Sequence, residues 1–123
     1  MLEVPATRTL RRNEAGRLVD GPRLGPRETL DNPALLDTIF AGLRGHHFQV
    51  TERPTGARLR FHTGFANTTA QDAVVVTWTQ DEKSPFYCLE PWMGPPNSPE
   101  NQTGLHLVGA GQTQKFLVEV VHG

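Results

Sequence analysis

The sequence predicts an all-β protein in which two antiparallel sheets pack as a sandwich. Apolar and polar residues alternate along most of the chain, and this period of two is typical of strands. The 10 prolines and 12 glycines among the 123 residues indicate many turns between short strands. An all-β chain of this length must pack two sheets or close a barrel to bury its apolar faces. We therefore expect one domain over residues 1–123, with about six or seven strands.

The first third of the chain contains a strand, a loop and the one helical candidate. Residues 2–6 alternate apolar side chains with others, which predicts a strand. Residues 17–33 are rich in turn-forming residues and predict an irregular surface loop. Residues 32–43 are the only segment with helical signals, because Asn32 could cap a helix and Pro33 suits its first position.

A β-hairpin is predicted around the turn Pro54-Thr55-Gly56. Apolar residues alternate at positions 48 and 50 before this turn and at 59 and 61 after it. Residues 72–79 contain three consecutive valines, so this strand is expected to be covered on both faces. Later strands are predicted at residues 86–92, 105–109 and 114–121.

The composition argues against several kinds of partner and location. The net charge is −1, from 12 basic and 13 acidic residues, which predicts no attraction to nucleic acid or to an anionic membrane. No apolar window is long enough to span a membrane, and arginines interrupt any apolar leader near the N-terminus. A cytoplasmic location is therefore expected. Cys88 is the only cysteine, so no internal disulfide can form.

No metal and no cofactor are expected. His46 and His47 are adjacent, so on a strand their side chains would point to opposite faces and would not share an ion. The other histidines in strand-like segments, His62 and His106, stand alone in the sequence and are expected at the surface.

One segment near the C-terminus resembles a known family. Residues 86–92 form an apolar strand that carries Cys88-Leu89-Glu90-Pro91-Trp92, and the proline-rich Pro95-Pro96-Asn97 and two further strands follow. This order resembles the C-terminal end of the aldose 1-epimerases, the galactose mutarotase-like proteins, and most of all the bacterial branch with a CxEPW strand. Residues 36–40, Leu-Asp-Thr-Ile-Phe, resemble the Leu-Asp-x-x-Phe element of that family. The resemblance covers residues 2–121 but only the C-terminal half of the family's usual length.

The resemblance implies a fold, an activity and a site. It implies that the sandwich is part of a galactose mutarotase-like supersandwich, and that the chain interconverts the α and β anomers of a free hexose. Glu90 would be the base that removes the proton from the anomeric hydroxyl, as general acid–base catalysis requires. Asp37 would accept hydrogen bonds from sugar hydroxyls, and Trp92 and Trp78 could offer their faces to the C–H surfaces of the sugar.

Two departures from the family leave a second function open. The family's general acid is a histidine in the N-terminal half, and nothing in this chain matches it. Gly109-Ala110-Gly111-Gln112 stands where the family has a Pro-Gly-Glu type of turn. A chain with the base but without the acid is also compatible with a non-catalytic carbohydrate-binding or structural β module. The sequence is compatible with a natural short protein and with a piece of a longer one.

Each candidate residue also has a structural interpretation. Glu90 could be a rim carboxylate paired with Arg58 or Arg60, Asp37 could cap a turn, and Trp78 could belong to the core. Half of a larger sandwich would also expose apolar faces and open sheet edges, which favours pairing with another chain. A homodimer that covers the exposed sheet is therefore a further expectation.

Overall fold

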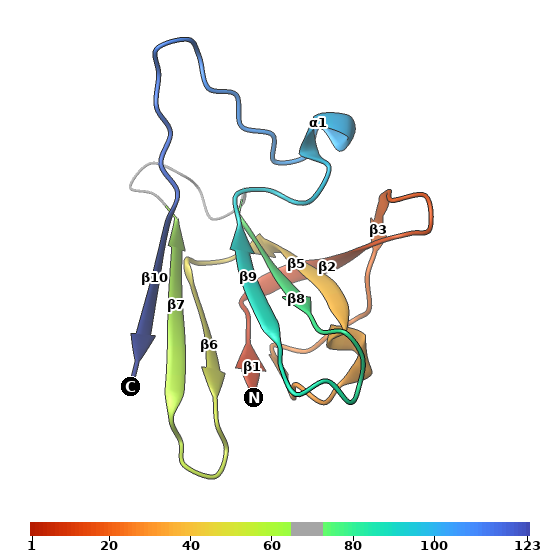
Figure 1. Ribbon diagram of the computed structural model, residues 1–123, viewed down its shortest axis with the longest axis vertical. Coiled ribbons are helices and arrows are strands. Elements are labelled where there is room, and N and C mark those ends of the chain that lie inside the picture. Colours follow the sequence, from red (N-terminus) through yellow and green to blue (C-terminus); the bar gives the residue numbers. More distant parts are fainter. Residues whose placement is uncertain (65–72) are drawn as a thin grey trace.

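The computed structural model describes residues 1–64 and 73–123 and consists of two antiparallel five-stranded sheets (Figure 1). The first sheet has the order β10-β7-β6-β1-β4, with β1 (Leu2–Glu3), β4 (Arg27–Glu28), β6 (His47–Thr51), β7 (Arg58–Gly64) and β10 (Leu117–His122). The second has the order β3-β2-β5-β8-β9, with β2 (Ala6–Arg12), β3 (Leu18–Asp20), β5 (Asp37–Leu43), β8 (Val74–Trp78) and β9 (Cys88–Trp92). The predicted all-β antiparallel sandwich is confirmed.

The core between the two sheets is built from side chains of both. Phe48 of β6 and Phe61 of β7 are directly opposite each other, and their rings stack with centroids 4.5 Å apart. The second sheet contributes Phe40 and Val75, which are buried in the same cluster. The other buried members of this cluster are Leu2, Val4, Leu35, Leu43 and Ala73. Burial of apolar surface between the sheets is therefore what holds them together.

The predicted hairpin is confirmed as the β6–β7 pair. Phe48 lies opposite Phe61 and Val50 opposite Leu59. The turn between the strands is closed by the amide of Gly56, which donates to the carbonyl of Glu52 at 2.8 Å. Local turn chemistry and the alternation of apolar residues agree here, so the register is fixed by both.

The helix predicted over residues 32–43 is wrong for most of its length. The side chain of Asn32 does cap a helix, because it accepts a hydrogen bond from the amide of Ala34 at 3.0 Å. That helix is a single 3-10 turn, η1 (Pro33–Leu35), and strand β5 begins two residues later. Strand β5 lies between β2 and β8 and is buried over most of its length. Pairing on both sides therefore outweighs the helical signals at its start.

Several loops also differ from the expectation. Residues 17–33 were expected to be irregular, but they contain the two short strands β3 and β4, each paired with one neighbour. Residues 105–109 were expected to be a strand and form none, and Leu107 is 85% exposed. The last strand begins at Leu117 rather than at 114. Residues 1–64 and 73–123 contain ten strands, more than predicted, mainly because β1, β3 and β4 are additional strands of only two or three residues.

The three valines of β8 are buried on both faces of the second sheet, as predicted. Val75 belongs to the core between the sheets, whereas Val74 and Val76 belong to a second buried cluster on the outer face. The outer cluster also contains Leu10, Ile39 and Ala41. A buried cluster on the outer face requires something that covers it.

Gly42 explains how β5 contributes side chains to both buried clusters. Ala41 belongs to the outer cluster and Leu43 to the core between the sheets, although side chains two residues apart on a regular strand share a face. Gly42 lies between them with a positive φ of 61°, a conformation that favours glycine. This residue therefore turns the strand so that Leu43 faces the core.

The segment after β9 covers part of the outer face. Pro95 and Gly104 line a hollow together with Leu10, Ala41 and Val74 of the outer cluster. The side-chain amide of Asn97 donates to the carbonyl of Gly16, in the turn between β2 and β3, at 2.9 Å. The short helix α1 (Ser98–Asn101) lies in this segment. Among the residues that the structure describes, no helix has the length and apolar character to cross a membrane.

Candidate functional site

The four residues proposed from the sequence line one small hollow on the outer face of the second sheet. Asp37, Trp78, Glu90 and Trp92 surround a space of about 80 Å³. The rest of the lining consists of Arg12, Ile39, Val76 and Pro96. Residues that are far apart in the sequence therefore meet at one place.

The strand register explains this convergence. Asp37 of β5 lies opposite Trp78 of β8, and Glu90 of β9 lies opposite Val76 of β8. Side chains two residues apart on a strand share a face, so Trp92 projects on the same side as Glu90. The outer face of three adjacent strands thus presents two carboxylates and two indole rings around the apolar side chains of Ile39 and Val76.

Glu90 is held by its neighbour on the same face of β9. The indole N–H of Trp92 donates to Oε2 of Glu90 at 2.9 Å. The alternative of a rim carboxylate paired with Arg58 or Arg60 is not supported, because both arginines lie on β7 of the other sheet. A half-buried carboxylate with one oxygen fixed by a donor is well oriented to act on a bound molecule.

Asp37 forms an ion pair rather than a cap. Its Oδ2 lies 3.5 Å from a guanidinium nitrogen of Arg12 on β2, and both side chains are nearly half exposed. Asn32, not Asp37, caps the preceding helical turn. Exposed pairs of this kind contribute roughly 0–1 kcal/mol, so Arg12 does little for stability and chiefly places a cation beside the carboxylate. Sequence analysis missed Arg12, because only strand pairing brings β2 beside β5.

The two tryptophans are at the surface. Trp78 and Trp92 are each 38% exposed, so the alternative of Trp78 as a core residue is wrong. The ring of Trp78 packs at a tilt against Phe86, with centroids 5.9 Å apart. Both indoles therefore combine a fixed position with an exposed surface beside the hollow, and amphipathic rings of this kind suit a ligand with apolar and polar edges.

None of the described residues that line the hollow is a histidine. Nδ1 of His46, just before β6, lies 2.9 Å from the carbonyl oxygen of Thr63 on β7. His47 of β6 stacks on His62 of β7 with ring centroids 4.6 Å apart, so these three histidines lie in or beside the first sheet. Within residues 1–64 and 73–123 there is no group of three or more His, Cys, Asp or Glu side chains that could hold a metal ion. The proton-transfer groups at the hollow are thus two carboxylates.

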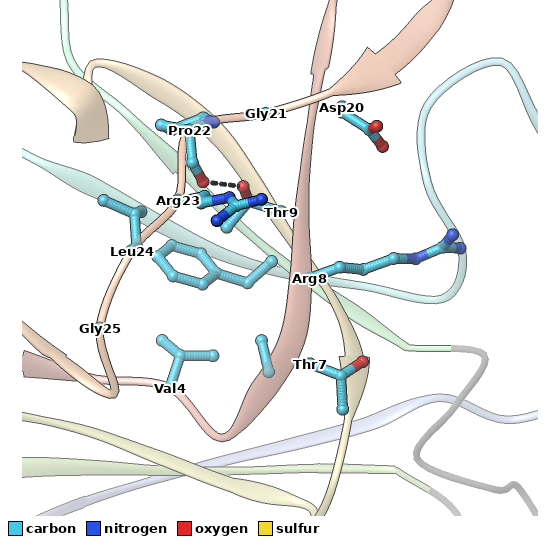
Figure 2. Close-up of a pocket in the computed structure, with 12 residues that line it drawn as sticks. Val4, Thr7, Arg8, Thr9, Asp20, Gly21, Pro22, Arg23, Leu24 and Gly25 are labelled. Atoms are coloured by element: carbon cyan, nitrogen blue, oxygen red, sulfur yellow. Dashed lines mark hydrogen bonds between the residues drawn. The ribbon is translucent and has the colours of Figure 1, made fainter.

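A larger hollow of about 390 Å³ lies elsewhere, between β2 and residues 20–25 (Figure 2). Val4 and Leu24 form part of its apolar floor, and the hydroxyl of Thr9 donates to the carbonyl of Pro22 at its wall. Figure 2 shows Arg23 beside Thr9, whereas Arg8 extends away on the other side of β2. Among the residues that the structure describes, Asp20 is the only carboxylate in its lining. None of the four residues proposed from the sequence lines it.

Comparison of the chain with protein-family models, curated proteins and solved structures finds no match. The family resemblance noted in the sequence therefore remains a proposal, and the function must be argued from the hollow itself.

Proposed function

We propose that the hollow binds a free hexose and that the chain acts on it as an aldose 1-epimerase, interconverting the α and β anomers. One observation carries the proposal, namely that Glu90 and Asp37 converge between two exposed tryptophans in one hollow. Carboxylates accept hydrogen bonds from sugar hydroxyls, and indole rings pack against the C–H surfaces of a sugar ring.

Glu90 is the base of the proposed reaction. Its carboxylate removes the proton of the anomeric hydroxyl while the ring oxygen gains a proton, and the bond between C1 and the ring oxygen breaks. Rotation about C1–C2 and reversal of these steps give the other anomer. Because Trp92 binds Oε2, the other oxygen of Glu90 is the one that faces the substrate in this proposal. A positioned proton transfer contributes roughly 10²–10⁴ in rate.

The ring oxygen must receive its proton from water, because no imidazole lines the hollow. The loss of one of two positioned proton transfers raises the barrier by about 3–5 kcal/mol. The proposal therefore predicts slow catalysis. Pockets for small molecules usually measure roughly 300–1,000 Å³. The hollow is much smaller, so the sugar enters with one edge only and binds weakly, with a Kd of roughly 1 mM.

The second candidate function is a non-catalytic carbohydrate-binding module. It is favoured by the same lack of a histidine at the hollow, since binding needs the carboxylates and indoles but no acid. Both candidates bind a small sugar and involve no nucleic acid, membrane or cofactor. Both are compatible with the cytoplasmic location expected from the sequence. They differ in whether the rate of anomer exchange changes.

Polarimetry tests the catalytic proposal. Crystalline α-D-glucose or α-D-galactose is dissolved at low buffer concentration, and optical rotation is followed with and without the protein. We expect the wild type to accelerate equilibration and Glu90→Gln to be inactive, because an amide cannot accept the proton. The matched control is Glu14→Gln, which changes an exposed carboxylate between β2 and β3 and should behave as wild type. An active Glu90→Gln variant would refute Glu90 as the base.

Tryptophan fluorescence separates the two candidates. The chain has two tryptophans and both line the hollow, so the emission reports on this site alone. A saturable change on titration with glucose or galactose, without acceleration in the polarimeter, would establish the binding module instead. If neither fluorescence nor rotation responds, the hollow does not bind these sugars and both candidates fail.

A further inference from the structure

The hollow under the segment after β9 is the larger of two on the outer face of the second sheet. Its volume is about 530 Å³, within the range of roughly 300–1,000 Å³ that is usual for small-molecule pockets. Leu10, Ala41 and Val74 form its apolar floor, and Pro95 and Gly104 belong to its wall. Among the described residues, none lines both this hollow and the proposed sugar site, so the two are separate.

Two arginines give this hollow a positive charge. Arg8 and Arg44 are the only charged residues in the described part of its lining, which contains no carboxylate. Neither guanidinium has an ion-pair partner within residues 1–64 and 73–123, whereas Arg12 pairs with Asp37 and Arg27 with a glutamate. Uncompensated charges of one sign in a hollow attract ligands of the opposite sign. The lining therefore favours an anion.

The strand register brings the two arginines to the same face. Arg8 of β2 lies opposite Ala41 and two residues from Leu10, so its side chain projects from the outer face. Figure 2 shows this side chain extending away from β2, toward the segment after β9. Arg44 directly follows β5, and its amide donates to the carbonyl of Pro5 at 2.7 Å. Arg8 is three residues further along, or about 10 Å. Because both guanidinium groups are on long stems, they can reach one oxyanion between them.

The segment that covers the hollow, residues 94–104, is held by contacts within itself. Gly94 has a φ of 110°, and a Cβ at this position would collide with the carbonyl oxygen of Gly104, so the two ends of the segment touch. Nδ2 of Asn101 donates to the carbonyl of Pro96 at 2.9 Å. Compact loops with touching ends are frequently functional. The wall of the hollow is therefore formed without a ligand.

We propose that this hollow binds a small organic anion, with its phosphate or carboxylate group between Arg8 and Arg44 and its apolar part against Ala41 and Val74. Guanidinium groups bind both kinds of oxyanion through paired hydrogen bonds. Both arginines are exposed, so salt screens part of the attraction. We expect a Kd of roughly 1 mM at low ionic strength. The site shares no described residue with the sugar hollow and does not depend on the sugar proposal.

NMR titration of the ¹⁵N-labelled chain tests the site with four probes. Phenyl phosphate and benzoate each join an oxyanion to an apolar ring, and the one that binds more tightly identifies the preferred anion. Inorganic phosphate has the charge without the ring, and benzyl alcohol has the ring without the charge. We expect the amide resonances of residues 41–42 and 103–104 to shift with both organic anions but not with benzyl alcohol. Inorganic phosphate should bind about fivefold more weakly than phenyl phosphate, because it contacts no apolar floor.

Arginine variants test the two cations. Arg8→Gln and Arg44→Gln should each raise the Kd of both organic anions about 5- to 10-fold, because each removes one charged donor pair. Arg11→Gln is the matched control, since Arg11 lies on the same strand but projects from the opposite face. This variant should leave the Kd unchanged. All three positions are exposed, so we expect the variants to fold.

Three results would overturn the proposal. The first is that neither phenyl phosphate nor benzoate shifts the resonances of residues 41–42 and 103–104. The second is an equal loss of affinity in Arg11→Gln, which would indicate attraction to the general charge of the surface. The third is equal affinity for inorganic phosphate and phenyl phosphate, because the apolar floor would then play no part. If one arginine variant fails to fold, the other variant and the four probes decide the outcome.

Discussion

The indole N–H of Trp92 binds Oε2 of Glu90 at 2.9 Å, two residues away on the same face of β9. This bond fixes one oxygen of the carboxylate relative to the hollow, and the proposed function assigns the other oxygen to the sugar. Trp92 was expected from the sequence as a surface for the sugar. The structure gives it a positioning contact as well, so its ring and its N–H can be tested separately.

Trp92→Phe should lower the rate of anomer exchange more than it lowers sugar affinity. Phenylalanine keeps an aromatic face beside the hollow but has no N–H to hold Glu90. A hydrogen bond to a charged group at a partly exposed site is worth about 1 kcal/mol, so the rate should fall roughly 3- to 10-fold. Polarimetry gives the rate, and fluorescence of the remaining Trp78 gives the affinity. An equal loss in both would show that Trp92 acts only as a sugar surface.

Asp37→Asn should weaken sugar binding without destabilising the fold. The change removes a charged acceptor at the hollow, and we expect a roughly 5- to 10-fold rise in the sugar Kd. The ion pair with Arg12 is exposed, so unfolding free energy should change by about 1 kcal/mol or less. Sugar titration and urea denaturation measure the two effects. Asp20→Asn, an exposed carboxylate on β3, is the control, and an equal loss of affinity there would point to a nonspecific effect.

Gly42→Ala should destabilise the fold through two separable causes. The first is the positive φ of 61°, which costs a residue with a side chain about 1–2 kcal/mol. The second is a clash, because a Cβ at this position would meet the hydroxyl oxygen of Thr7. We expect a total loss of about 2–3 kcal/mol by urea denaturation. In a Thr7→Ala background the loss should shrink to the backbone contribution, and the same loss in both backgrounds would contradict the clash.

Tyr87 should make stability fall at high pH. Burial against the core raises the pKa of its hydroxyl above the ordinary 10.0, and the charge of Asp31 adds to this effect. The unfolded chain therefore loses this proton at lower pH than the folded protein does. The stabilisation is complete below pH 10 and is lost as the pH rises through the folded pKa. Tyr87→Phe should reduce this loss of folding stability at high pH.

The absorbance of the tyrosinate measures this pKa directly, because Tyr87 is the only tyrosine. We expect the titration midpoint of the folded protein to lie above 10.0 and to return to that value in urea. Equal midpoints in the folded and unfolded chain would show that burial of Tyr87 has no effect on its ionisation.

Local patterns predicted some elements well and failed where pairing decided the structure. The hairpin of β6 and β7 follows from a Pro-Thr-Gly turn between two alternating segments, so both of its signals are local. Asn32 and Pro33 are also local signals, and they start a helix as predicted, but this helix ends after one turn. The next residues become β5 because β2 and β8 pair with both of its edges, and neither partner is close in the sequence.

The sequence by itself determined the all-β class, the β6–β7 hairpin, the doubly buried valines of β8 and the identity of four candidate site residues. Turn chemistry, alternation and residue type decide the first three features, and each can be read within a short window. The four candidate residues were identified through the resemblance of residues 36–40 and 86–97 to the aldose 1-epimerases. Only the tertiary structure decided that Asp37 and Glu90 share a hollow with Arg12, that Trp92 holds Glu90, and that β10 is the end strand of its sheet within the described part of the chain. These depend on strand order and register, which arise from contacts between distant segments and therefore appear only when the sheets have formed.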